Sequence, residues 1–304
     1  MVSREKIDLH SFSEANASYL LEKVKKLWIT AQVIQFMFFF QRNKQLAILV
    51  TLIAIGWVYN FLQVAAFTPR MSLSQFGPGM NALTFLTSQP PTAMSNLISS
   101  IPLCSNFGPS WTIESLGGSI LMWFGMVLAM MVPTLLIPRF LRPVNIQAFS
   151  IFLFGYVCIW FIFCIFGVAL QWGLQAYGVL DNSLLINNSL ASAVMFLIIG
   201  GVQLLKPKLA SSPRCPKLSK STQTNATLLS DDFRAGLKRG ATCVHSCFPL
   251  MLVMFVFGLM NLVAMVFLTV IMYLMANFAT GLVTRGPGFA LIVSGILLLG
   301  LNYT

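Results

Sequence analysis

Charged side chains are scarce in this sequence: they make up 9% of its 304 residues, whereas 57% are hydrophobic. The long apolar runs contain no Asp or Glu, and the nearest acidic residues, Glu114 and Asp181, flank such runs. Proton relays, paired-carboxylate catalysis and di-iron centres all require buried carboxylates. We therefore expect a protein that is not an enzyme and has no catalytic residues.

Histidine and cysteine are also few. With only His10 and His245, two membrane helices cannot supply a bis-histidine haem site. Glycine-rich phosphate loops and paired-cysteine zinc motifs are missing from the Ser/Thr/Lys-rich segment 207–239. The six cysteines are too scattered for a disulfide scaffold. They are Cys104, Cys158, Cys164, Cys215, Cys243 and Cys247.

The chain instead consists largely of long apolar runs, and its mean hydropathy is +0.81. Each run is close to the ~20 residues that an α-helix needs to cross a bilayer. We predict an all-α, polytopic transmembrane helix bundle of about six to seven spans. The candidate spans are 46–67, 117–138, 147–175, 189–205, 240–257, 259–277 and 285–302.

The number of spans depends on the uncharged run 240–277. As one straight helix it would be about 57 Å long, against a hydrocarbon core of ~30 Å. It must therefore break, tilt or protrude. Pro249 lacks the N–H that would bond the carbonyl of His245, and Gly258 with Asn261 forms a second weak point. A kinked helix and a tight hairpin both fit this pattern.

The net charge of +11 reflects membrane topology rather than a nucleic-acid partner. All but two of the 19 Lys and Arg residues lie before the first span, between spans two and three, or between spans four and five. The exceptions are Arg70 and Arg285, and Arg285 would join the majority if 240–277 crosses twice. Basic residues concentrate on the cytoplasmic side. We predict a cytoplasmic N-terminus.

We divide the chain into a cytoplasmic segment, 1–45, and a transmembrane domain, 46–304. Within the first, 17–40 fits an amphipathic helix lying on the membrane surface, or equally one packed on the bundle or a partner subunit. The transmembrane domain carries an outer loop, 68–116, and a cytoplasmic loop, 207–239. The outer loop is rich in Pro and Gly, and its length favours a partner contact or a lid over metal capture.

The most informative run begins at Cys243 and contains a stripe of sulfur. At 100° per residue, Cys243, Cys247 and Met251 fall on one helix face, whereas His245 points nearly the opposite way. Thiolate and thioether ligands select Cu(I) and similar soft ions. Polar groups at membrane depth usually face a bundle interior. The stripe therefore predicts a soft-metal site near the cytoplasmic end of the fifth span.

A second sulfur face lies in span two, where Met122, Met126 and Met130 follow an i, i+4, i+8 spacing. If the two faces meet in the bundle, thioethers and thiols together would make a Cu(I) environment. Methionine also fills irregular apolar gaps, so a methionine stripe at helical spacing is more often part of an ordinary core than a set of ligands.

Three motifs resemble a bacterial family of predicted metal-binding integral membrane proteins, a domain of unknown function, over about 117–300. The first, W-x-x-M-x-x-A-M-M-x-P, is matched by Trp123, Met126, Ala129, Met130, Met131 and Pro133. The second, G-Y-x-x-x-W with a later A-L-Q-W, is matched by Gly155, Tyr156, Trp160, Ala169, Leu170, Gln171 and Trp172. The third is matched by Gln203, Lys208, Cys215, Cys243, Cys247, Leu250, Met251, Gly258, Met260, Asn261 and Met265.

The chain departs from this family at two expected thiols, because Ser211 and Ser246 stand where the pattern has cysteine. Cys215, Cys243 and Cys247 remain, with methionines and His245 to complete a ligand shell. Such a set suits a trigonal Cu(I) site, or the metal has been lost and the fold retained.

The leading hypothesis is a metal-handling protein of the bacterial inner membrane that binds or delivers copper in support of a membrane metalloenzyme. Its candidate ligands are Cys243, Cys247, Cys215, Met251, His245, Met126 and Met130. The alternative is a non-catalytic accessory subunit of a larger membrane complex that has partly lost its metal site. Both make the lipid bilayer and membrane proteins the partners. A solute transporter is disfavoured because charged residues are missing from the spans.

Overall fold

The computed structural model describes residues 43–67, 72–86, 112–136, 145–180, 184–186, 188–205, 225–277 and 281–303. These residues are mostly helical, and their only β pairing is an isolated bridge between Leu180 and Ile186. The expected surface helix 17–40, Cys104, Cys215 and the middle of the cytoplasmic loop lie outside the described residues.

All seven predicted apolar runs form helices, which confirms the all-α polytopic fold. The first, Asn43–Phe67, is followed by α3 (Ile113–Met131), α4 (Ile146–Ala176), α5 (Ser189–Leu205), α6 (Asn225–Leu252), α7 (Met254–Phe257), α8 (Leu262–Asn277) and α9 (Gly281–Tyr303). Short 3-10 helices are η1 (Leu73–Phe76), η2 (Met80–Leu86) and η3 (Val132–Leu135).

Five of the described helices are long and apolar enough to cross a membrane: Asn43–Phe67, Ile113–Leu135, Ile146–Ala176, Ser230–Phe257 and Leu282–Leu301. The other two apolar helices, α5 and α8, have 17 and 16 residues. At 1.5 Å per residue they are about 26 and 24 Å long, slightly less than a hydrocarbon core.

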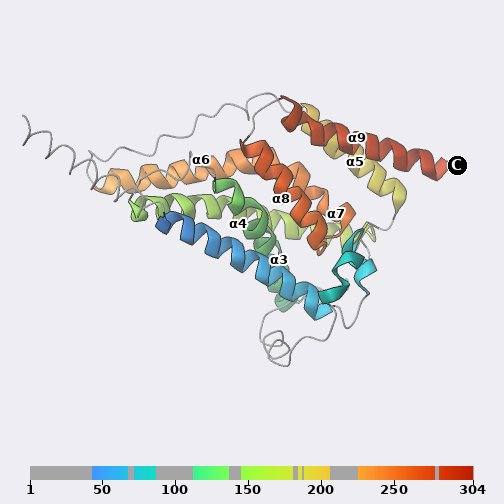
Figure 1. Ribbon diagram of the computed structural model, residues 1–304, viewed down its shortest axis with the longest axis horizontal. Coiled ribbons are helices and arrows are strands. Elements are labelled where there is room, and N and C mark those ends of the chain that lie inside the picture. Colours follow the sequence, from blue (N-terminus) through green and yellow to red (C-terminus); the bar gives the residue numbers. More distant parts are fainter. Residues whose placement is uncertain are drawn as a thin grey trace, which may run out of the picture.

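The bundle consists of the helix Asn43–Phe67 together with α3, α4, α6 and α8 (Figure 1). The α5 and α9 helices pack mainly on each other and lie to one side of it (Figure 1). Their backbones approach closely, since a Cβ on Gly200 would lie 2.8 Å from the carbonyl oxygen of Gly288. Glycine contacts of this kind are typical of helix pairs in membranes.

The run 240–277 forms a hairpin, which decides between the two possibilities left by the sequence. The α6 helix continues past Pro249, and the turn occurs at Gly258, whose φ of +97° is in the region that favours glycine. Asn261 then begins α8, because its side-chain oxygen accepts from the N–H of Ala264. The α8 helix returns beside α3 and η3 (Figure 1).

The segment 72–86 closes over this hairpin. The Nδ2 atom of Asn261 donates to the carbonyls of Pro78 and Phe257, at 3.0 Å each. A Cβ on Gly258 would lie 2.4 Å from the carbonyl oxygen of Phe76, so only glycine fits. Phe76 and Met80 are themselves buried. The segment 72–86 is thus a packed cap on the α7–α8 turn.

The α6 helix begins at Asn225, earlier than the predicted start at 240, because its first half packs along α4. Gly236 and Gly240 form a G-x-x-x-G pair on the contact face. A Cβ on Gly236 would lie 2.1 Å from the carbonyl oxygen of Phe152, and one on Gly155 would lie 2.5 Å from that of Phe233. Small residues allow this near-contact of backbones. This backbone contact sets the position of the next turns of α6 relative to α4.

Candidate metal centre

The sulfur stripe of α6 faces the bundle interior, as predicted. Cys243, Cys247 and Met251 follow one another at successive turns, and their side chains are 4%, 5% and 1% exposed. His245 is exposed on the other side of the helix. The two thiols lie within hydrogen-bonding reach of each other. They form a pair of soft donors screened from solvent, which His245 does not join.

Side chains from two other elements contact Cys243. The hydroxyl of Tyr156, on α4, donates to the Cys243 Sγ atom at 3.4 Å. The hydroxyl oxygen of Thr134, on η3, lies 4.0 Å from the same sulfur. Arg239, one turn earlier on α6, is near enough to interact electrostatically with the Cys243 side chain. The sulfur is therefore surrounded by polar groups although it is buried.

The end of α3 places these hydroxyls. The α-helix changes to the 3-10 helix η3 at Val132, beside Pro133, and carbonyls at a helix end lack intrahelical partners. The carbonyl of Met131 accepts from the Thr134 hydroxyl at 2.6 Å and from the Tyr156 hydroxyl at 3.2 Å. One backbone oxygen thus holds both hydroxyls beside Cys243.

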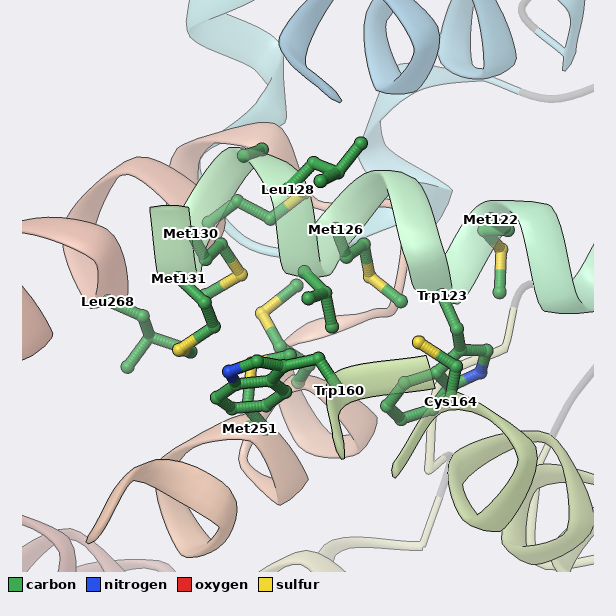
Figure 2. Close-up of a cluster of buried hydrophobic side chains, with 14 of the residues drawn as sticks. Met122, Trp123, Met126, Leu128, Met130, Met131, Trp160, Cys164, Met251 and Leu268 are labelled. Atoms are coloured by element: carbon green, nitrogen blue, oxygen red, sulfur yellow. The ribbon is translucent and has the colours of Figure 1, made fainter. Parts of the chain in front are cut away.

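Buried methionines continue the sulfur stripe into the bundle. Met126, Met130 and Met131 of α3 and Met251 of α6 point into a common cluster beside the indole of Trp160 (Figure 2). All four methionines are at most 1% exposed. The two predicted sulfur faces, one on α3 and one on α6, therefore do meet in the core.

Trp123 closes the cluster toward the far end of the bundle. Its Nε1 atom donates to Oε1 of Gln171 at 2.8 Å, and both residues are buried. Its ring packs so closely on α4 that a Cβ on Gly167 would lie 2.6 Å away. Met122 and Cys164 lie beside this indole (Figure 2). The sulfur-rich core is therefore bounded by rigid aromatic groups.

This arrangement offers soft donors rather than hard ones. Among the described residues, no three His, Cys, Asp or Glu side chains are close enough to hold a metal ion together. A metal centre here would combine the thiol pair with thioethers, or with a thiol from outside the described residues. Such ligands suit Cu(I) and disfavour Mg²⁺ or Ca²⁺.

The structure therefore brings some of the predicted ligands together and leaves others apart. Cys243, Cys247, Met251, Met126 and Met130 lie in one buried core, His245 lies outside it, and Cys215 is not among the described residues. Sequence reasoning did not select Tyr156, Thr134, Met131 or Arg239 as neighbours of the site. The sequence did contain a signal for the hydroxyls of Tyr156 and Thr134, because polar groups within apolar helices need buried hydrogen-bond partners.

The stretch that contains this core is similar to a known protein family. Residues 120–298 match the model of a family described as PpoB2, copper chaperone. No curated protein and no solved structure matches the chain. The matched stretch includes both sulfur faces, the α4–α6 contact and the α7–α8 hairpin.

Proposed function

The chain belongs to the PpoB2 copper chaperone family, and on that premise we propose that it binds Cu(I) through Cys243 and Cys247 and delivers the ion to a membrane metalloenzyme. The observation that carries this proposal is the buried pair of adjacent thiols, which belongs to the same core cluster as the buried methionines. Two thiolates bind Cu(I) strongly, and a thioether third ligand leaves an ion that can still be exchanged.

The remaining ligands have different parts in this proposal. Met251, one turn beyond Cys247, supplies the third donor, and Met126 with Met130 lines the core that the ion faces. Cys215 precedes α6 in the sequence, and His245 is exposed near the thiols. These two serve as the groups through which copper enters or leaves the buried pair.

The proposed setting is the bacterial inner membrane, with the N-terminus in the cytoplasm. Five spanning-length helices support a membrane location, and the basic residues that precede the first span support this orientation. The thiols would then lie near the cytoplasmic face. A chaperone requires no catalytic group, which agrees with the absence of carboxylates from the apolar runs.

Removal of both thiols tests the function. Wild-type protein, purified anaerobically in detergent and titrated with Cu(I) against a chromophoric chelator, is expected to hold about one copper. The double variant Cys243→Ser, Cys247→Ser should bind it more than about 100-fold more weakly, since changes to groups around metal ligands alone cost 10–100-fold.

Cys158→Ser is the matched control, because Cys158 is a partly exposed thiol on α4 and is not a proposed ligand. It should bind copper like the wild type. A double cysteine variant that retains wild-type copper affinity would exclude the thiol pair as the binding site.

A second candidate function, an accessory subunit of a membrane complex, is favoured by the α5–α9 pair. These helices expose large apolar side chains, including Leu205, Phe289 and Leu301, and have few contacts with the bundle. Co-purification with other subunits in fixed stoichiometry from native membranes would support this function. A single monodisperse species would contradict it.

A further inference from the structure

The hydroxyl protons around Cys243 can be assigned individually. Each of Thr134 and Tyr156 has one hydroxyl proton. That of Thr134 is directed to the Met131 carbonyl at 2.6 Å, so Thr134 can only accept from the Cys243 thiol. That of Tyr156 is within reach of the Met131 carbonyl at 3.2 Å and of the Cys243 Sγ atom at 3.4 Å. Tyr156 is therefore the hydroxyl with a proton available to the sulfur.

Copper binding changes which acceptor receives the hydrogen bond from the Tyr156 hydroxyl. When Cu(I) binds, the S–H bond breaks, a Cu–S bond forms, the proton leaves to solution, and no electron is transferred. The sulfur then only accepts hydrogen bonds, and it carries negative charge. Charge-assisted hydrogen bonds are stronger than neutral ones, so the Tyr156 hydroxyl shifts from the carbonyl to the sulfur. The carbonyl keeps the hydrogen bond from Thr134.

We infer that Tyr156 is a positioning residue for copper, whose hydroxyl stabilises the Cys243 thiolate by a hydrogen bond once the metal is bound. This inference rests on the copper site proposed above. The helix α4 can hold the hydroxyl there because Gly155 and Gly236 bring α4 and α6 into backbone contact beside it. Tyr156 is fully buried, so water does not replace it as a donor.

The variant Tyr156→Phe tests the inference, with Tyr59→Phe as its matched control. Tyr59 lies on the helix Asn43–Phe67, and its hydroxyl accepts a hydrogen bond from Gln63 at 2.7 Å. Both variants remove one hydroxyl from the bundle, but only the first removes a donor to Cys243. Groups that hydrogen-bond metal ligands contribute 10–100-fold to metal affinity. We expect Tyr156→Phe to weaken Cu(I) binding by about that factor and Tyr59→Phe to leave it unchanged.

Spectroscopy separates this role from simple packing. A hydrogen bond lowers the energy of the sulfur lone pairs, so its loss should shift the thiolate-to-Cu(I) charge-transfer band to lower energy at unchanged copper stoichiometry. Site-specific 3-fluorotyrosine at position 156 has nearly the native shape and donates more strongly. It should shift the band to higher energy, and it serves as the test if Tyr156→Phe does not fold.

The inference is overturned if the charge-transfer band does not move in either Tyr156 variant while copper binding still requires Cys243 and Cys247. The proposed function would remain intact in that case. If the double cysteine variant binds copper normally, the proposed function fails, and the inference fails with it. A band shift confined to the Tyr156 variants supports the inference.

Discussion

Single side chains connect the helices around the sulfur core. The Trp123 indole donates to Gln171, which joins α3 to α4, and the Tyr156 hydroxyl contacts both Met131 and Cys243, which joins α4 to α3 and α6. Each of these hydrogen bonds satisfies a polar group that would be costly to bury alone. The bundle is therefore held at its sulfur-rich core by a few directional contacts as well as by apolar packing.

Trp123→Phe should destabilise the bundle, because it leaves the buried Gln171 oxygen without its donor and reduces packing against Gly167. The expected cost is about 1–3 kcal/mol. Thermal unfolding in detergent measures it as a lowered Tm.

Trp172→Phe provides the comparison, since Trp172 lies on the same helix as Gln171 but is 52% exposed. It should change Tm little. Equal shifts for the two variants would show that the Trp123–Gln171 hydrogen bond contributes nothing measurable.

Among the helices, the α7–α8 turn determines the path of α8 and of the chain that follows it. Gly258 adopts a positive φ, and the cap segment 72–86 occupies the space that a side chain would need. The same turn leaves the carbonyl of Phe255 available, and the N–H of Ile186 bonds it at 3.1 Å. The segments 72–86 and 184–186 thus complete the hydrogen bonding of the α7–α8 turn.

Gly258→Ala should destabilise the hairpin by more than about 2 kcal/mol. The left-handed conformation alone costs an L-residue about 1–2 kcal/mol, and the new Cβ would also collide with the carbonyl oxygen of Phe76. Proteolysis of the hairpin in detergent, or thermal unfolding, would detect the change.

Gly201→Ala is the matched control, because Gly201 lies in α5 and a Cβ there would have no atom of the described residues within 4 Å. It should be neutral or slightly stabilising, as alanine favours helix more than glycine does. Similar losses of stability in both variants would show that the close contact between Gly258 and Phe76 is not what stabilises the turn.

At the scale of the whole molecule, each of the seven candidate runs forms an apolar helix in the described residues, and the hairpin at Gly258 separates two of them. With a cytoplasmic N-terminus, seven crossings bring the chain to the outer side at Thr304. We expect alkaline phosphatase fused after Thr304 to be active and green fluorescent protein at that point to be dark.

Fusions after Leu205 should behave in the opposite way, because four crossings return the chain to the cytoplasm before the basic residues of 206–239. Fluorescence at Thr304 would contradict the seven-span topology. Phosphatase activity after Leu205 would contradict the orientation.

Much of the architecture could be predicted from local sequence. Apolar length located all seven helices, and 100° periodicity placed Cys243 and Cys247 inward with His245 outward, because both are properties of one helix. The early start of α6 was missed, since polar residues before 240 obscured a helix that depends on its glycine contact with α4. The neighbours of Cys243 were missed for a related reason: Thr134 and Tyr156 are distant from it in the chain.

By itself, the sequence determines a helical protein whose apolar runs are long enough to cross a membrane and that has two sulfur-bearing helix faces, because hydropathy and helical period are local properties. Only the tertiary structure decides that 240–277 turns back at Gly258, that the two sulfur faces share one core, and that the hydroxyls of Tyr156 and Thr134 flank Cys243. These outcomes depend on which helices pack together. That packing is set by contacts between residues far apart in the chain, such as Phe76 with Gly258 and Phe152 with Gly236.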